Sequence, residues 1–185
     1  MTRDAKVLAV DDRSENLIAL EAILQGLPVE ITSVTSGDDA LKRLLLEDYA
    51  VILLDAQMPG MDGFETASHI KQRERTRRIP IVFLTAANYD PHLAFRGYQL
   101  GAVDYLTKPL DPWVLRSKVQ VFADLWKLNT ELAAQASECT ALRRAISDTL
   151  ELLGGPGAVD GDASALIARA RARLVAAQAF EATRN

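Results

Sequence analysis

Five residues whose side chains can bind a metal ion or a phosphoryl group stand at the ends of short apolar runs. Asp11 and Asp12 follow the first run, Asp55 ends another, and Thr85 and Lys108 close two more. A buried carboxylate without a cation is costly enough to take up a proton instead, and carboxylates that share a crevice repel one another. Oxygen ligands without His or Cys suit Mg²⁺, which binds one or two carboxylates together with phosphate oxygens.

The threonine and the lysine extend this chemistry to a phosphoryl group. Lys108 offers a mobile point charge and Thr85 offers a hydroxyl donor. Carboxylates act as nucleophiles toward phosphoryl groups, and nearby cations stabilise the charge during transfer. Taken singly, each residue is typical of a helix cap, a turn or a solvated loop. Their occurrence in order, each at the end of an apolar run, predicts a phosphoryl-accepting site with Mg²⁺.

Short apolar runs alternate with amphipathic patterns along the first two thirds of the chain. The runs predict strands at 6–10, 29–34, 51–54, 79–84 and 102–106, and the patterns predict helices at 16–25, 37–47, 64–71 and 90–100, the first capped by Ser14. Such alternation is typical of a doubly wound α/β fold with a five-stranded parallel sheet. Its functional crevice lies beyond the carboxyl ends of the strands, so we expect Asp55 to surface there and not in the core.

Composition restricts the class of protein. The chain has 185 residues, 49% of them hydrophobic and 25% charged, with a net charge of -4, which argues against a nucleic-acid surface. Its one cysteine, Cys139, excludes an intrachain disulfide, and we expect it to be a small buried apolar residue. The sequence has no secretory h-region and no apolar run of about 18 residues. We therefore expect a cytoplasmic protein without a membrane segment.

The segment from about residue 5 to 123 resembles the receiver domain of two-component response regulators. The resemblance rests on four stretches in the right order and spacing: VDDRSEN, LLDAQMPGMDGFE, PIVFLTA and GAVDYLTKP. It implies a flavodoxin-like receiver fold and a histidine kinase or phosphotransfer protein as phosphodonor. A flavodoxin-type FMN site would instead need a phosphate-cradling loop after the first strand, where this chain has Asp11 and Asp12.

The resemblance also implies a role for each site residue. Asp55 would be the phosphoryl acceptor, and Thr85 and Lys108 would hold the phosphoryl group, with a cis peptide between Lys108 and Pro109. The Mg²⁺ ligands would be Asp12 directly, Asp11 through water, Asp55, and the backbone carbonyl of Gln57. Tyr105 would act with Thr85 as the switch. Haloacid-dehalogenase-type phosphatases need an Asp two residues after the nucleophile, where this chain has Gln57, so we expect no turnover of a separate substrate.

The sequence beyond the receiver has a heptad pattern. A 4-3 spacing reaches twelve positions, and nine of the twelve are apolar. The twelve positions are Val114, Lys118, Val121, Leu125, Leu128, Leu132, Gln135, Cys139, Leu142, Ile146, Thr149 and Leu153. No Pro or Gly interrupts 113–153, so the last receiver helix is predicted to continue to the glycines at 154 and 155. We expect a receiver at 1–123, a coiled-coil extension at 124–153, a turn at 154–161 and a C-terminal helix at 162–185.

Two arrangements of this tail remain open. One is a parallel coiled-coil dimer in which the second helix folds back to form a four-helix bundle, with Gln135 and Thr149 as polar layers. The other is a helical hairpin within one chain. No histidine follows His92 and no catalytic or DNA-binding signature follows the receiver, so we expect output through a protein partner. The alternatives are a stand-alone phosphorelay shuttle and an unphosphorylated scaffold.

Overall fold

A computed structural model describes residues 4–86 and 102–154, and residues 168, 171, 172 and 175 of the remainder. Five strands form one parallel sheet in the order β2-β1-β3-β4-β5. The strands are β1 (Ala5–Val10), β2 (Val29–Val34), β3 (Val51–Asp55), β4 (Ile81–Ala86) and β5 (Asp104–Lys108). The helices are α1 (Ser14–Leu24), α2 (Gly37–Leu46), α3 (Gly63–Gln72) and α5 (Pro112–Gly154). The predicted doubly wound α/β fold is confirmed.

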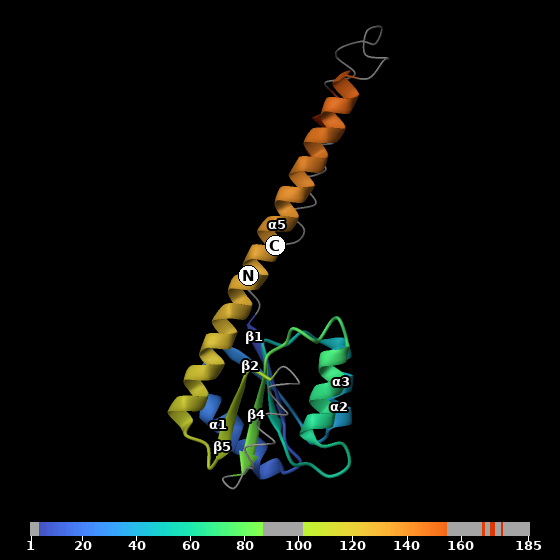
Figure 1. Cartoon of the computed structure of the whole chain (residues 1–185). Helices are drawn as coiled ribbons and strands as arrows, with labels where there is room; N and C mark the ends of the chain where they lie inside the picture. Colours follow the sequence, from blue (N-terminus) through green and yellow to red (C-terminus); the bar gives the residue numbers. More distant parts are fainter. Residues whose placement is uncertain (1–3, 87–101, 155–167, 169–170, 173–174, 176–185) are drawn as a thin grey trace. The chain divides into compact units, whose positions relative to one another are not determined.

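The two faces of the sheet are covered by different helices (Figure 1). Leu8 and Ile52 belong to the core cluster that also contains residues of α2 and α3. The neighbouring strand residues Val7 and Leu53 belong to the cluster with α1 and the start of α5. Successive side chains of a strand point to opposite faces, so each strand supplies both clusters. All five residues of β3 are buried, which explains its continuous apolar run.

Two predicted strands lie later in the chain than expected. The structure has β4 at Ile81–Ala86 and β5 at Asp104–Lys108, against the predicted 79–84 and 102–106. Ile79 packs against the core from the preceding turn, where its N–H donates to the Thr76 carbonyl at 3.0 Å. Its hydrophobicity therefore reflects burial and not strand pairing. As a consequence, Thr85 and Lys108 lie within the strands and not after them.

The other predicted boundaries agree within two residues, but the cap of α1 differs from the prediction. Arg13 is the N-cap residue, without a side-chain cap hydrogen bond, and Ser14 is already helical. The reason is local, because the Arg13 N–H donates to the Asp11 carboxylate at 3.0 Å and so fixes the turn before the helix. The predicted helix at 90–100 lies outside the described residues.

The chain divides into two units, residues 2–127 and 128–185. In the second unit α5 ends at Gly154, as the glycines predict. Between Leu128 and Thr149 no described residue is buried. Cys139 is exposed, so its predicted burial is wrong for the single chain, because no described residue around it on α5 is buried. Of the predicted helix at 162–185, residues 168, 171, 172 and 175 are described, and they are helical.

None of the described helices combines the length and the apolar character that crossing a bilayer requires.

Candidate functional site

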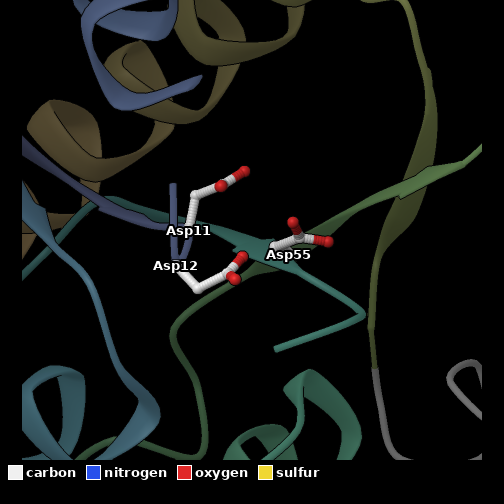
Figure 2. A group of neighbouring side chains, drawn as sticks. All are labelled: Asp11, Asp12 and Asp55. Atoms are coloured by element: carbon white, nitrogen blue, oxygen red, sulfur yellow. The ribbon is translucent and has the colours of Figure 1, made fainter. Parts of the chain in front are cut away.

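Three carboxylates meet at the carboxyl ends of the two strands where the strand order reverses (Figure 2). Asp11 and Asp12 follow β1, and Asp55 is the last residue of the adjacent β3. One carboxylate oxygen of each lies within 4.8 Å of the others. Asp11 is 0% exposed and Asp55 is 7% exposed. The predicted convergence of these residues is confirmed, but the expectation that Asp55 surfaces is wrong.

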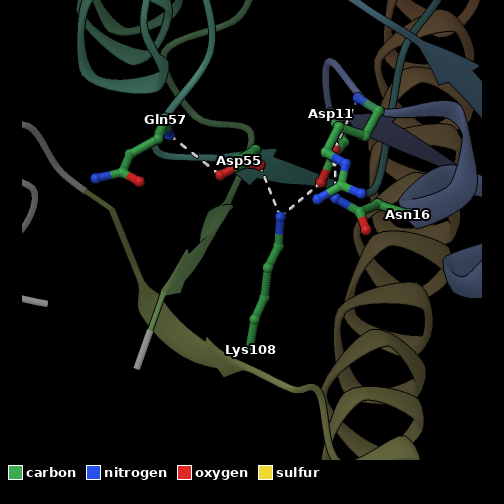
Figure 3. A network of polar contacts seen from close by, with 6 residues as sticks. Asp11, Asn16, Asp55, Gln57 and Lys108 are labelled. Carbon is green, nitrogen blue, oxygen red and sulfur yellow. Dashed lines mark hydrogen bonds and ion pairs between the residues drawn. The ribbon is translucent and has the colours of Figure 1, made fainter. Parts of the chain in front are cut away.

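Lys108 explains how two of these carboxylates can be buried. Its Nζ donates to Asp11 Oδ2 and to Asp55 Oδ2, each at 2.7 Å (Figure 3). Lys108 is the last residue of β5, and its side chain reaches across β4 to Asp55 on β3. The peptide bond between Lys108 and Pro109 is cis, as the resemblance implies. Burial alone lowers the pKa of Lys108, but the hydrogen bonds to Asp11 and Asp55 outweigh it and raise the pKa.

Asp11 has further donors on its other oxygen. Asp11 Oδ1 accepts from the Arg13 N–H at 3.0 Å and from Asn16 Nδ2 at 2.8 Å. Burial raises the pKa of Asp11, yet the hydrogen bonds from Lys108, Asn16 and Arg13 together lower it below its ordinary value. Asn16 was not among the residues predicted for the site. It could have been found from the sequence, because it lies within VDDRSEN, in the first turn after the Asp pair.

Asp55 is in a less favourable environment for its charge. Its Oδ1 accepts from the Gln57 N–H at 3.1 Å, and its Oδ2 accepts from Lys108. Burial raises the pKa of Asp55, and the hydrogen bonds from Lys108 and Gln57 offset this only in part, while the charge of Asp11 adds to the rise. This hydrogen bond to Asp55 also brings the Gln57 backbone to the edge of the carboxylate cluster. A further cation near Asp55 would therefore favour its ionised form.

The two remaining predicted residues lie on β4 and β5. Thr85 is 1% exposed, and its hydroxyl oxygen is buried without a hydrogen-bond partner in the described structure. A buried hydroxyl without a partner is costly, so this oxygen is suited to an incoming hydrogen-bonding group. Tyr105 is partly buried and its ring stacks on Phe83, with the ring centroids 5.3 Å apart.

The donor set fits a hard divalent cation. The cluster offers carboxylate oxygens from Asp11, Asp12 and Asp55, and Asp12 is less buried than the other two. Such oxygens suit Mg²⁺, which keeps several waters and takes few protein ligands. Lys108 supplies one positive charge to this cluster of three carboxylates, which leaves an excess of negative charge for a metal ion to neutralise.

Comparison with known proteins agrees with this geometry. The model of the response regulator receiver domain matches residues 7–120, more than half of the chain. Response regulator PleD of Caulobacter vibrioides is 38% identical over 116 residues, which is 63% of this chain and 25% of PleD. Sensor protein GacS of Pseudomonas syringae pv. syringae is 32% identical over 181 residues, which is 95% of this chain and 18% of GacS. The chain thus matches a quarter or less of the length of these relatives.

A solved structure leads to the same family. The chemotaxis response regulator CheY4 of Vibrio cholerae matches with a TM-score of 0.60 and 30% identity, over 65% of this chain and 99% of that protein. The chain therefore belongs to the family of response regulator receiver domains of two-component systems, which accept a phosphoryl group on an aspartate and bind Mg²⁺ at a cluster of acidic residues.

Proposed function

We propose that Asp55 accepts a phosphoryl group from a histidine kinase or a phosphotransfer protein. The observation that carries the proposal is the position of Asp55 at the end of β3, hydrogen-bonded to Lys108 beside Asp11. A carboxylate oxygen of Asp55 attacks the phosphorus of a phosphohistidine, the P–N bond breaks, and its electron pair leaves with the imidazole. The product is an acyl phosphate on Asp55, and water later hydrolyses it to aspartate and inorganic phosphate.

The carboxylate cluster would hold Mg²⁺ with a distinct task for each residue. Asp12 binds the ion directly together with Asp55 and the Gln57 carbonyl. Asp11 acts through water, since it is fully buried and accepts three hydrogen bonds, from Arg13, Asn16 and Lys108, where Asp55 accepts two. When bound, the ion supplies positive charge beside the phosphoryl oxygens. An Asp12→Ala chain should therefore bind Mg²⁺ at least about tenfold more weakly by calorimetry, and wild-type affinity in that variant would remove Asp12 from the ligand set.

Thr85 and Lys108 would hold the transferred group. Lys108 already contacts Asp55 and stays with the phosphorylated side chain, whose added charge it neutralises. The unpartnered Thr85 hydroxyl gains an acceptor in a phosphoryl oxygen. Tyr105 lies on the neighbouring strand β5, offset by two residues in register from Thr85 on β4. Movement of Thr85 toward that oxygen frees space next to Tyr105, and the two residues together form the switch.

The first test of this function is labelling of the full chain by acetyl phosphate. We expect a mass increase of one phosphoryl group in the presence of Mg²⁺ and little or none with EDTA. The acyl phosphate should be lost in base. Labelling that is indifferent to EDTA, or that survives base, would contradict an aspartyl phosphate formed at a metal site.

For the output we propose a dimer formed by the helices after the receiver. The supporting observation is that apolar positions of the heptad stripe are exposed on α5, with Leu128 and Leu132 each 53% exposed. Patches of this kind on a single chain usually mark an interface. In this proposal residues 1–123 form the receiver and 124–153 the coiled coil, and 162–185 fold back as a second helix of a four-helix bundle. The bundle passes the signal to a protein partner, and the chain turns over no separate substrate.

A further inference from the structure

Helix α3 begins against the backbone of the proposed phosphoryl acceptor. Its first residue, Gly63, is buried, and its N–H donates to the Ala56 carbonyl at 3.2 Å. A Cβ at Gly63 would lie 2.2 Å from the Asp55 carbonyl oxygen and 2.8 Å from the Ala56 Cα. These are backbone atoms at the end of a fully buried strand, which cannot rotate away as a side chain can. Only glycine fits the contact as it stands.

The same contact closes the loop that carries Gln57. The loop leaves the sheet after Ala56 and returns at Gly63, where the hydrogen bond joins its two ends. Inside the loop, the Gln57 N–H donates to the Asp55 carboxylate. At its far end Asp62 caps α3 by accepting from the Glu65 N–H at 2.8 Å. The start of α3 and the Asp55–Gln57 backbone therefore form one connected unit.

Helix α3 is itself fixed to the core. Phe64, Ala67 and Ile70 are all buried in the cluster that also contains residues of β1, β3 and β4. A shift of the first turn of α3 would have to repack these side chains, or else the end of β3 would have to move. Because protein cores are closely packed, both responses would displace the groups around Asp55.

We propose that Gly63 is a positioning residue of the phosphoryl-acceptor site. Because it has no side chain, Gly63 lets the first turn of α3 lie directly against the backbone at Asp55 and Ala56 and so fix the backbones of Asp55 and Gln57. The inference rests on the proposed role of Asp55 and goes beyond it, since Gly63 is not among the residues proposed to hold the metal ion or the phosphoryl group. Coupling between two sites is reciprocal, so a change at Asp55 and Gln57 is passed to the first turn of α3.

A second glycine provides a matched control. Gly37 is also buried and is also the first residue of its helix, α2. A Cβ at Gly37 would lie 2.2 Å from Thr66 Oγ1 and 3.1 Å from Met61 Sδ. Both atoms belong to side chains, although Thr66 is buried in the first turn of α3 and its hydroxyl donates to the Asp62 carbonyl at 2.7 Å, so that relief of the contact breaks this bond. The same substitution therefore makes an equally close contact at the same helix position, but it does not touch the backbone of Asp55.

The experiment compares Gly63→Ala with Gly37→Ala in the full chain, by Mg²⁺ calorimetry and by the rate of labelling with acetyl phosphate. We expect Gly63→Ala to bind Mg²⁺ at least about tenfold more weakly and to label more slowly, as substitutions behind metal ligands do. Gly37→Ala, whose Cβ meets side-chain atoms and not the Asp55 backbone, should lose clearly less in both measurements. Alanine is the better helix former, so a loss in Gly63→Ala cannot come from helix propensity. Equal behaviour of the two variants would overturn the inference.

The outcomes separate this inference from the proposed function. A wild-type chain that takes no label rejects the role of Asp55 itself. A labelled wild type with an unaffected Gly63→Ala rejects the positioning role alone. If Gly63→Ala does not fold, the amide resonances of the wild type decide. The Gly63 amide should follow an Mg²⁺ titration together with that of Gln57, while the Gly37 amide stays in place, and an unresponsive Gly63 amide overturns the inference.

Discussion

Two regions of this molecule reverse the usual rule that charges are exposed and apolar side chains are buried. At the carboxyl end of the sheet, Asp11 and Asp55 are 0% and 7% exposed. In the later part of α5, Leu142 and Ile146 are 53% and 51% exposed. The buried charges find a counterion within the chain, in Lys108. Within the described part of the chain the exposed leucine and isoleucine have no such compensation, which is why we infer a second copy of the chain there. A metal ion is inferred at the site because Lys108 supplies one positive charge to three carboxylates.

Helix α5 displays the difference within one element. Near its start, Leu115, Val119 and Ala123 are buried, with 1% exposure or less. Val121 and Leu125, on other sides of the same turns, are 56% and 49% exposed. The exposed stripe thus begins while the opposite side still packs on the sheet, and it continues past residue 127 into the second unit. One helix can therefore serve a receiver core and a separate interface.

The largest expected effect is the loss of the dimer on truncation. We expect the full chain to sediment as a dimer at micromolar concentration, with or without phosphorylation. A chain cut after Lys127, which keeps the buried Ala123, should sediment as a monomer. Burial of each large apolar side chain contributes roughly 1.5–3 kcal/mol, and truncation removes several from both chains. A monomeric full chain, or a truncated chain that is equally dimeric, would remove the coiled coil from this account.

A smaller effect is expected from one charge in the stripe. Leu132→Lys should weaken the dimer at least about tenfold, since about 1.4 kcal/mol lost from the interface is a factor of ten. Ser137→Lys is the control, because Ser137 is exposed and lies outside the heptad stripe. Sedimentation over a concentration series measures both. The interface would have to lie elsewhere on the helix if Ser137→Lys had the greater effect.

The smallest effect concerns pH and the ion pair of Lys108 in EDTA. The pKa of Lys108 in the folded chain is raised above its ordinary 10.5. Its contribution to the free energy of unfolding is therefore fully present below about pH 10.5 and is lost as the pH rises through the folded pKa. In this pH range the free energy of unfolding, measured with urea, should fall more steeply for the wild type than for Lys108→Met.

Lys71 is a control for this measurement, because its pKa is shifted in the direction opposite to that of Lys108. Burial lowers the pKa of Lys71, so Lys71→Met should not remove the loss of stability above about pH 10.5. Parallel profiles for the wild type and Lys108→Met would contradict a stabilising ion pair between Lys108 and the buried carboxylates.

Much of the fold and of the site could be predicted from local patterns. Apolar runs closed by Asp11, Asp55 and Lys108 predict strands whose ends meet, and the structure brings these residues together. The late starts of β4 and β5 could not be predicted. Hydrophobicity reports burial, and Ile79 is partly buried in a turn and not in a strand.

Other features depend on contacts between distant parts of the chain. The burial of Asp55 depends on Lys108, which is far away in sequence and reaches it across β4. The role of Gly63 depends on a close approach to the Asp55 carbonyl oxygen, which no periodicity of apolar residues encodes. The position of Asn16 in the site could have been predicted from the sequence, because Asn16 occupies the first turn of the helix that follows the Asp pair.

The central claim is tested most directly by intact mass and peptide mapping of the full chain after treatment with acetyl phosphate and Mg²⁺. Asp38→Asn is the matched control, because Asp38 is an exposed acidic residue in the first turn of α2. We predict that the wild type and Asp38→Asn gain one phosphoryl group, mapped to the peptide that contains Asp55, and that Asp55→Asn gains none. A phosphoryl group on Asp55→Asn at the level of the wild type would contradict the account.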